Sequence, residues 1–191
     1  MGKVILGFSM SLDGFINDRK GSVEPLYTDL LDWRETEMGK ESIQNTGAVV
    51  MGRNSFNMAE DPHWYAGNYE YQVPIFVLTH HVPKKKPKET EQLVFTFVTD
   101  SLESAIHHAK EAAGDKEVNI IGAANTAQQC LRAGLADELH VDVMPILLGG
   151  GLRLFEHINA EQIQLERIKV VELPAGRTHL RFRLVRSEHE V

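Results

Sequence analysis

The stretch from Val118 to Phe155 constrains the fold most, because it holds two short apolar runs joined by a helical pattern. The first run, Val118–Ile121, is typical of a buried strand, and the second, Leu139–Met144, alternates apolar and polar residues. Between them, apolar residues recur at helical spacing up to Gly134, where a helix stop is expected. Strand, helix and strand at this spacing predict a crossover unit of a parallel sheet.

Both of these predicted strands are followed by glycine, which suits a ligand site. Gly122 follows the first strand, and the run Gly149–Gly151 follows the second. Because glycine lacks a side chain, the backbone at these positions can approach a ligand closely. We interpret the unit as half of a nucleotide pocket.

The rest of the chain extends the same α/β pattern, and 191 residues predict a single domain over residues 1–191. Strands are predicted at Lys3–Ser9, Ala48–Met51, Pro74–Leu78 and Leu93–Val98. Helices are predicted at Thr28–Asn45 and Leu102–Ala113, and an aromatic loop at Asp61–Val73. Two final strands, Glu161–Glu172 and Thr178–Val185, predict an antiparallel pair at the sheet edge.

The composition excludes several classes of function. A net charge of -7 argues against general nucleic-acid binding, which needs a basic face. No apolar run approaches the roughly 20 residues of a membrane span. The single cysteine, Cys130, and the lack of a visible signal peptide favour a cytoplasmic protein. The nine histidines show no metal-binding spacing, so no metal site is predicted.

A segment suited to anions follows the strand Ala48–Met51. Gly52 ends the strand, and Asn54 and Ser55 begin a helix whose first N–H groups can bind an anion. Arg53 beside them carries a planar guanidinium suited to phosphate. A surface arginine on a capped helix is an equally good interpretation of this motif alone. The basic run Lys84-Lys85-Lys86 is interpreted as a solvated loop.

Asp13 stands just past the first predicted strand and is followed by Gly14. The pair fits an ordinary turn, and it equally fits a carboxylate that faces a ligand at the end of the strand. Both interpretations stay open on the spacing alone.

Four predicted strand ends carry small or phosphate-suited residues: Gly52-Arg53, Thr79-His80, Gly122-Ala123 and Gly149–Gly151. In open α/β sheets, ligands bind in the crevice at the carboxyl ends of the strands. Several such ends predict an extended ligand, and a dinucleotide fits better than a small metabolite. The GxGxxG fingerprint of the Rossmann fold is absent from the sequence.

Several motifs then follow one another in an order that resembles the dihydrofolate-reductase-like superfamily. They are Ser11-Leu12-Asp13-Gly14, Val50–Phe56, Gly122-Ala123-Ala124, Ala133–Leu139, and Pro145–Gly151 with Leu154-Phe155. The branch that the chain resembles most is the C-terminal reductase domain of the bifunctional riboflavin-biosynthesis deaminase/reductase. The resemblance runs from Lys3 to about Val185. It implies a three-layer α/β/α domain with a mixed, mainly parallel central sheet that binds NADPH.

The resemblance also implies roles for individual residues. Cofactor phosphates are expected at Arg53, Asn54 and Ser55, with Arg53 at the 2′-phosphate, and the adenosine end at Thr79 and His80. The pyrophosphate is expected at Gly122, Ala123, Ala124, Asn125 and Thr126, and the nicotinamide near Gly149 and Gly150. Asp13 is expected to face the substrate. The implied reaction is hydride transfer to a C=N or C=O bond of a small pterin-, pyrimidine- or related heterocycle.

Two departures from the riboflavin-reductase pattern motivate a second hypothesis. Ile121 stands where that pattern has an acidic residue, and Ala123 replaces the second glycine. A module that binds NADPH without turnover, as a sensor or interaction domain, is therefore the alternative. For dihydrofolate as the substrate, the resemblance implies a single acidic residue in the first helix. Asp29, Asp32 and Glu35 are available there, and the sequence does not choose among them. A homodimer is a further expectation, through Leu139–Met144 or the C-terminal pair.

Overall fold

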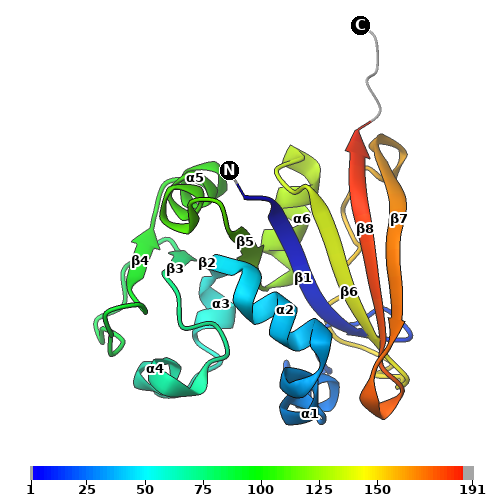
Figure 1. The fold of residues 1–191 in the computed structure, drawn as a ribbon. Helices are drawn as coiled ribbons and strands as arrows, with labels where there is room; N and C mark the ends of the chain where they lie inside the picture. Colours follow the sequence, from blue (N-terminus) through cyan, green and yellow to red (C-terminus); the bar gives the residue numbers. More distant parts are fainter. Residues whose placement is uncertain (1, 187–191) are drawn as a thin grey trace, which may run out of the picture.

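The computed structural model describes residues 2–186, and a mixed eight-stranded sheet forms its centre (Figure 1). Its strands are β1 (Val4–Ser11), β2 (Thr46–Gly52), β3 (Ile75–Leu78), β4 (Phe95–Val98), β5 (Glu117–Ile120), β6 (Glu138–Met144), β7 (Ile163–Glu172) and β8 (Thr178–Arg186). Their order is β4-β3-β2-β5-β1-β6-β8-β7. The first six strands in this order pair in parallel, and β8 and β7 are antiparallel to their neighbours.

Helices cover both faces of this sheet. They are α1 (Leu30–Glu35), α2 (Glu37–Asn45), α3 (Arg53–Phe56), α4 (Tyr65–Asn68), α5 (Leu102–Ala113) and α6 (Ala124–Ala133). Short 3-10 turns lie at Glu24–Leu26, Pro62–Trp64, Ala160–Gln162 and Pro174–Gly176. Figure 1 shows α1 and α2 on one side of the sheet and α5 and α6 on the other. The predicted three-layer α/β/α fold is confirmed.

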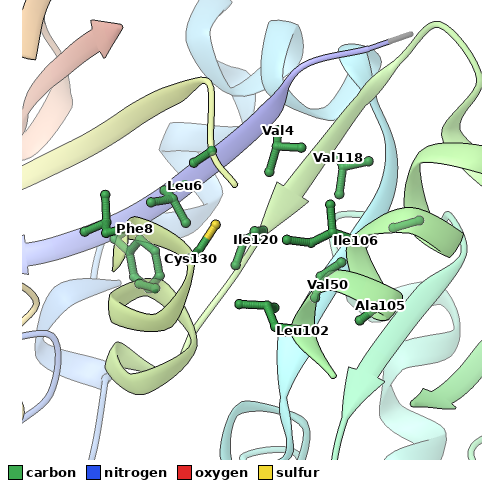
Figure 2. Close-up of a cluster of buried hydrophobic side chains, with 14 of the residues drawn as sticks. Val4, Leu6, Phe8, Val50, Leu102, Ala105, Ile106, Val118, Ile120 and Cys130 are labelled. Carbon is green, nitrogen blue, oxygen red and sulfur yellow. The ribbon is translucent and has the colours of Figure 1, made fainter. Parts of the chain in front are cut away.

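The alternation of side chains along the strands divides the core into two clusters. In β2, Ala48 and Val50 face α5 and α6, whereas Val49 and Met51 face the opposite layer. The α5/α6 side is shown in Figure 2, which labels Val4, Leu6, Phe8, Val50, Leu102, Ala105, Ile106, Val118, Ile120 and Cys130. By the same alternation, the odd-numbered residues of β1 point toward the α1/α2 layer.

The predicted crossover unit is confirmed as β5, α6 and β6. The two strands do not pair with each other, because β1 lies between them and pairs in parallel with both. Gly134 ends α6 in the left-handed conformation, at φ 56°. The predicted antiparallel C-terminal pair is also present, as β7 and β8.

Two predicted elements differ in the structure. The helix expected over Thr28–Asn45 is divided into α1 and α2 at Thr36, whose backbone is extended at φ -66° and ψ 158°. The Thr36 hydroxyl accepts a hydrogen bond from the N–H of Gly39 at 3.0 Å, so it caps a new helix there. The loop expected over Asp61–Val73 contains a 3-10 turn and α4, because Tyr65 is buried and stacks on Phe56 with ring centroids 5.5 Å apart.

Candidate functional site

The carboxyl ends of β2 and β5 meet at two glycines. The N–H of Gly52 donates a hydrogen bond to the carbonyl oxygen of Gly122 at 2.9 Å. A Cβ at Gly52 would lie 2.7 Å from Oγ1 of Thr126, and a Cβ at Gly122 would collide with the hydroxyl of Ser55. Gly122 also has a left-handed backbone, at φ +54°. Both positions therefore require glycine, and the space that a Cβ would fill holds two hydroxyl groups instead.

Two helices begin beside these glycines. Gly52 is the N-cap of α3, and Ala123 is the N-cap of the ten-residue α6; neither makes a side-chain cap hydrogen bond. Helix N-termini without such caps present N–H groups that can bind an anion. We call this cluster, made of Gly52–Ser55 and Gly122–Thr126, the glycine site. The structure thus brings together two segments of the chain that the sequence analysis selected separately.

Arg53 lies at the outer end of the glycine site. Its Nε donates to Oδ1 of Asn57 at 2.9 Å, and one terminal nitrogen donates to the carbonyl oxygen of His81 at 3.0 Å. Arg53 also lines a basic pocket with Lys84 and Lys85. Lys84, Lys85 and Lys86 are exposed in a loop, as predicted, and the fold brings Lys84 and Lys85 beside Arg53.

The predicted adenosine-end residues have different environments. Thr79 is buried, and its hydroxyl donates to the carbonyl oxygen of His81 at 3.0 Å, whereas His80 is exposed. Thr79 therefore shapes the loop that also receives the guanidinium of Arg53, and His80 faces outward.

Asp13 lies between the end of β1 and the glycine run. Its carboxylate accepts hydrogen bonds from the hydroxyl of Ser11 at 2.6 Å and from the N–H groups of Leu148 and Gly149 at 3.1 and 2.8 Å. These donors, the Ser11 hydroxyl foremost, lower the pKa of Asp13 to about 2. The carboxylate thus stays ionised and connects the β1 turn to the predicted nicotinamide segment. On the other side of that segment, Arg19 donates to the carbonyl oxygen of Gly149 and contacts Gly150.

A second pocket lies on the α1/α2 side of the sheet, and we call it the polar pocket. Its floor is formed by side chains that face the same way from four adjacent strands, in the order β5-β1-β6-β8. They are Asn119, Ser9, His140, Asp142, His179 and Arg181. Ser9 pairs in register with Asp142, which pairs in turn with His179.

Arg177 is the centre of a buried ionic cluster at this floor, with 2% of its surface exposed. Its guanidinium donates to Asp29 at 2.5 and 3.0 Å, to Asp142 at 2.8 Å and to the hydroxyl of Ser9 at 3.0 Å. A further bond reaches the carbonyl oxygen of Leu26 at 3.2 Å. Asp29 precedes α1 and is buried, so among the acidic residues considered near the first helix it is the one held at this floor.

The hydrogen bonds of His179 determine where its proton lies. The guanidinium of Arg181, which can only donate, gives a hydrogen bond from Nε to Nε2 of His179 at 3.0 Å. Nδ1 therefore carries the proton and donates to Asp142 at 2.5 Å. His140 lies beside this ring, and burial lowers the pKa of His140 to about 4, so His140 is neutral at pH 7.

The opposite side of the floor carries a neutral hydrogen-bonded chain. Asn119 Nδ2 donates to the hydroxyl of Tyr71 at 3.3 Å, and that hydroxyl lies 2.9 Å from the hydroxyl of Ser42. Four buried side-chain atoms have no partner among the described residues, and two of them, Oδ1 of Asn119 and the indole Nε1 of Trp33, belong to residues that line the polar pocket. Both atoms are enclosed by the surrounding side chains.

The glycine site and the polar pocket meet at the end of β5. Ile121 lines the polar pocket, and the next residue, Gly122, belongs to the glycine site. The sequence analysis selected the glycine site and missed the polar pocket. The available signal was the shared parity of polar residues on β6 and β8, but it becomes informative only once the strand order is known.

Comparison with known proteins agrees with this arrangement. A family model described as the RibD C-terminal domain matches residues 2–179. The chain belongs to the RibD C-terminal domain family. This confirms the resemblance to the dihydrofolate-reductase-like superfamily.

Solved structures extend the comparison. A protein from Shewanella sp. PV-4 that is described as a candidate riboflavin biosynthesis protein is 25% identical, with a TM-score of 0.76 over 96% of this chain and 99% of that chain. The deaminase/5-amino-6-(5-phosphoribosylamino)uracil reductase of Thermotoga maritima is 17% identical, with a TM-score of 0.71 over 96% of this chain and 57% of that chain. Dihydrofolate reductase from Enterococcus faecalis, complexed with NADP(H), is 17% identical, with a TM-score of 0.64 over 96% of each chain. The Thermotoga and Enterococcus proteins are described as reductases. Within residues 2–186, no helix has the length and apolar character needed to cross a membrane.

Proposed function

We propose that this chain is a single reductase domain that uses NADPH to reduce a C=N or C=O bond of a small heterocycle. The observation that supports the proposal is the junction of the two sites at Ile121 and Gly122, where phosphates bound at the glycine site would lie beside a ring bound in the polar pocket. NADPH, when bound, supplies the hydride. The protein contributes binding, orientation and exclusion of water from the reacting atoms.

The glycine site fits this cofactor because Gly52 and Gly122 let the two helix N-termini come together, with only the small hydroxyl groups of Ser55 and Thr126 against them. Arg53, with Lys84 and Lys85 in the same basic pocket, would hold the 2′-phosphate. The remaining proposed contacts are Asn54, Ser55, Gly122, Ala123, Ala124, Asn125 and Thr126 for the pyrophosphate, Thr79 and His80 for the adenosine end, and Gly149 and Gly150 for the nicotinamide end.

Asp13 has a positioning role in this proposal. All the hydrogen bonds described for its carboxylate go to Ser11, Leu148 and Gly149, and it is not among the residues that line the polar pocket. The carboxylate would therefore hold the glycine run in place for the nicotinamide. The catalytic contact that the resemblance implies for Asp13 stays a prediction.

The test is NADPH binding, followed by fluorescence, for the wild type and for Arg53→Ala. Loss of one charge-assisted contact should weaken NADPH binding by roughly 1.5–3 kcal/mol and leave NADH binding nearly unchanged. Arg132→Ala is the matched control, because Arg132 is exposed on α6 and donates to the carbonyl oxygen of His157. If the wild type does not bind NADPH at millimolar concentration, the proposal is wrong.

The sensor hypothesis makes a different prediction from the same protein. It is motivated by Ile121 and Ala123, which depart from the riboflavin-reductase pattern. It expects tight NADPH binding without NADPH oxidation across a panel of heterocycles. One efficient turnover would exclude it.

A homodimer through the C-terminal pair is a further part of the proposal. The edge strand β7 exposes Leu165, Ile168 and Val170, and an edge strand with apolar side chains favours association with a second copy. Sedimentation of the wild type and of Ile168→Lys measures this directly, and a monomeric wild type at micromolar concentration would contradict it.

A further inference from the structure

Reduction of a C=N or C=O bond needs a proton as well as a hydride. The carbon receives the hydride with both of its electrons, and the π electrons of the double bond move to the nitrogen or oxygen, which then takes a proton. A group that supplies this proton has to keep it at pH 7, border the pocket and lie near the predicted nicotinamide segment. The ionisable groups around the polar pocket differ in these three properties.

The carboxylates around the polar pocket are acceptors rather than donors. Asp29 and Asp142 both accept hydrogen bonds from the guanidinium of Arg177, which does not give up its proton in proteins. Glu70 lines the pocket and is paired with Arg34 at 3.1 Å. None of these ion pairs has a proton to transfer.

The two histidines of the floor are also unsuited to supply the proton. The Nδ1 proton of His179 is bonded to Asp142, and its Nε2 accepts from Arg181. His140 is neutral at pH 7, since burial lowers its pKa to about 4. His140 also pairs in register with Gly7, further from the carboxyl end of β1 than the pair of Ser9 and Asp142.

Tyr27 differs from these groups because a chain of hydrogen-bond donors lies behind its hydroxyl. Arg177 can only donate, and it donates to Oγ of Ser9 at 3.0 Å, so the Ser9 hydroxyl keeps its own proton for another acceptor. That acceptor is the hydroxyl of Tyr27, which is hydrogen-bonded to Ser9. The proton of Tyr27 is therefore left for a ligand in the pocket that Tyr27 lines. Of the charges that face this hydroxyl, Arg177 favours a phenolate, and Glu70 and Asp142 oppose it.

Tyr27 also lies at the end of the pocket where the reaction is expected. Ser9, its partner, stands two residues, about 7 Å, before Ser11 on the same face of β1. Ser11 binds Asp13, whose carboxylate holds the N–H of Gly149 in the predicted nicotinamide segment. Desolvation raises the pKa of Tyr27 from its ordinary value of 10.0, so Tyr27 keeps its proton at pH 7.

We infer that Tyr27 is the catalytic proton donor of the polar pocket, and that Ser9 is a positioning residue that connects it to Arg177. As the ring carbon receives the hydride, the ring nitrogen or oxygen takes the hydroxyl proton of Tyr27, and Ser9 donates to the phenolate that remains. Tyr27 is 36% exposed, so water that enters when the product leaves restores its proton. This inference rests on the proposed function, and it adds the proton transfer to the same site.

The experiment follows NADPH oxidation with 7,8-dihydropterin and 7,8-dihydrolumazine, whose ring C=N bonds can take a hydride and a proton. For the wild type, kcat should be nearly constant from about pH 6.5 to about pH 9, because Tyr27 stays protonated there. Tyr27→Phe should lower kcat roughly 100-fold, while KM for the ring and the affinity for NADPH change less than about threefold. Its remaining rate should rise about tenfold for each unit by which the pH falls, because the proton then comes from the solvent.

Two further variants separate catalysis from a structural effect. Tyr69→Phe is the matched control and should keep the wild-type kcat, because Tyr69 does not line the polar pocket and its hydroxyl has no partner among the described residues. Ser9→Ala removes the link between Arg177 and Tyr27, and it should lower kcat about three- to tenfold and keep the flat pH profile. Loss of packing alone would lower kcat in Tyr27→Phe without giving it a new pH dependence.

Three results would overturn the inference. The first is a wild-type kcat with a flat pH profile in Tyr27→Phe. The second is the steep pH profile in His140→Gln instead, which would assign the proton to His140. The third is no oxidation of NADPH with either ring by a wild type that binds NADPH. Failure of the proposed cofactor site is a different result, namely no binding of NADPH by the wild type.

Discussion

The glycine site and the polar pocket are built from different parts of the chain, the first mainly from backbone groups and the second mainly from side chains. The glycine site is made of backbone groups and small residues, and its two halves need only Gly52 and Gly122 to come together. The polar pocket is made of long side chains whose charges are buried and mutually compensated around Arg177. We therefore expect that substitutions of ligand-contacting side chains cost little stability in the glycine site. In the polar pocket, the side chains that would contact a ligand also stabilise the fold.

The largest expected effect tests this difference at the centre of the ionic cluster. Arg177→Met leaves the carboxylates of Asp29 and Asp142 buried without their partner, and it should lower the free energy of unfolding by about 3–5 kcal/mol. Urea unfolding measures it. The control is Arg183→Met, since Arg183 pairs with Glu166 on the exposed hairpin and its loss should cost less than ~1 kcal/mol. Equal losses in the two variants would mean that the cluster contributes no more than a surface pair.

The next effect is a pH dependence that arises from His140 in the polar pocket. The folded protein keeps His140 neutral down to a pKa of about 4, whereas the unfolded chain takes up a proton near the ordinary value of about 6.5. The unfolded state therefore binds more protons between these values, so this contribution is fully present above about pH 6.5 and is lost as the pH falls toward 4.

His140→Gln should remove that pH dependence while keeping an N–H donor for Glu138, with which His140 makes a 2.9 Å hydrogen bond. The difference between the two proteins should reach roughly 3 kcal/mol across the window. Thermal unfolding at half-unit pH steps measures it. Parallel pH profiles for the variant and the wild type would show that another group carries the acid sensitivity.

A smaller effect is expected in the glycine site. Gly122→Ala places a methyl group against the hydroxyl of Ser55 in a left-handed backbone, and overpacking of this kind costs about 1–3 kcal/mol. The double variant with Ser55→Ala should recover part of that loss, because the colliding oxygen is gone. Chemical unfolding of the single and double variants gives the coupling, and strictly additive losses would place the strain elsewhere.

The smallest effect concerns the helical wall that covers the polar pocket. Thr36→Ala removes the cap of α2, and it should cost about 1 kcal/mol of unfolding free energy. Because Met38 and Ser42 line the pocket from α2, ring binding should also weaken, while NADPH binding at the glycine site stays unchanged. A change in NADPH affinity of the same size would show that the two regions are not independent.

The glycine site could be predicted from the sequence, whereas the polar pocket could not. Local signals were enough for the glycine site, because a strand end, a glycine and a helix start are neighbours in the chain. The polar pocket needed the strand order, since His140, Asp142 and His179 come from β6 and β8, and their shared face emerges only when these strands pair. Arg177 precedes β8 within a turn region, and nothing local in the sequence distinguishes it from the exposed arginines that follow.

The division of the first predicted helix has a comparable cause. The apolar stripe over Thr28–Asn45 continues past Thr36, so periodicity alone does not show the break. A threonine inside a helical pattern fits both a helix interior and a cap, and tertiary packing selects the cap here. Asp29 could not be distinguished from the other acidic residues of this segment, because its partner Arg177 lies 148 residues away in the sequence.

The two residues that follow β5 connect the polar pocket to the glycine site. Ile121 lines the polar pocket, Gly122 belongs to the glycine site, and a single peptide unit joins the two residues. A ligand in the polar pocket and a ligand at the glycine site would therefore contact adjacent residues of the chain. If a ligand in one site changes the affinity of the other site by some factor, the ligand of the other site must change the affinity of the first by the same factor.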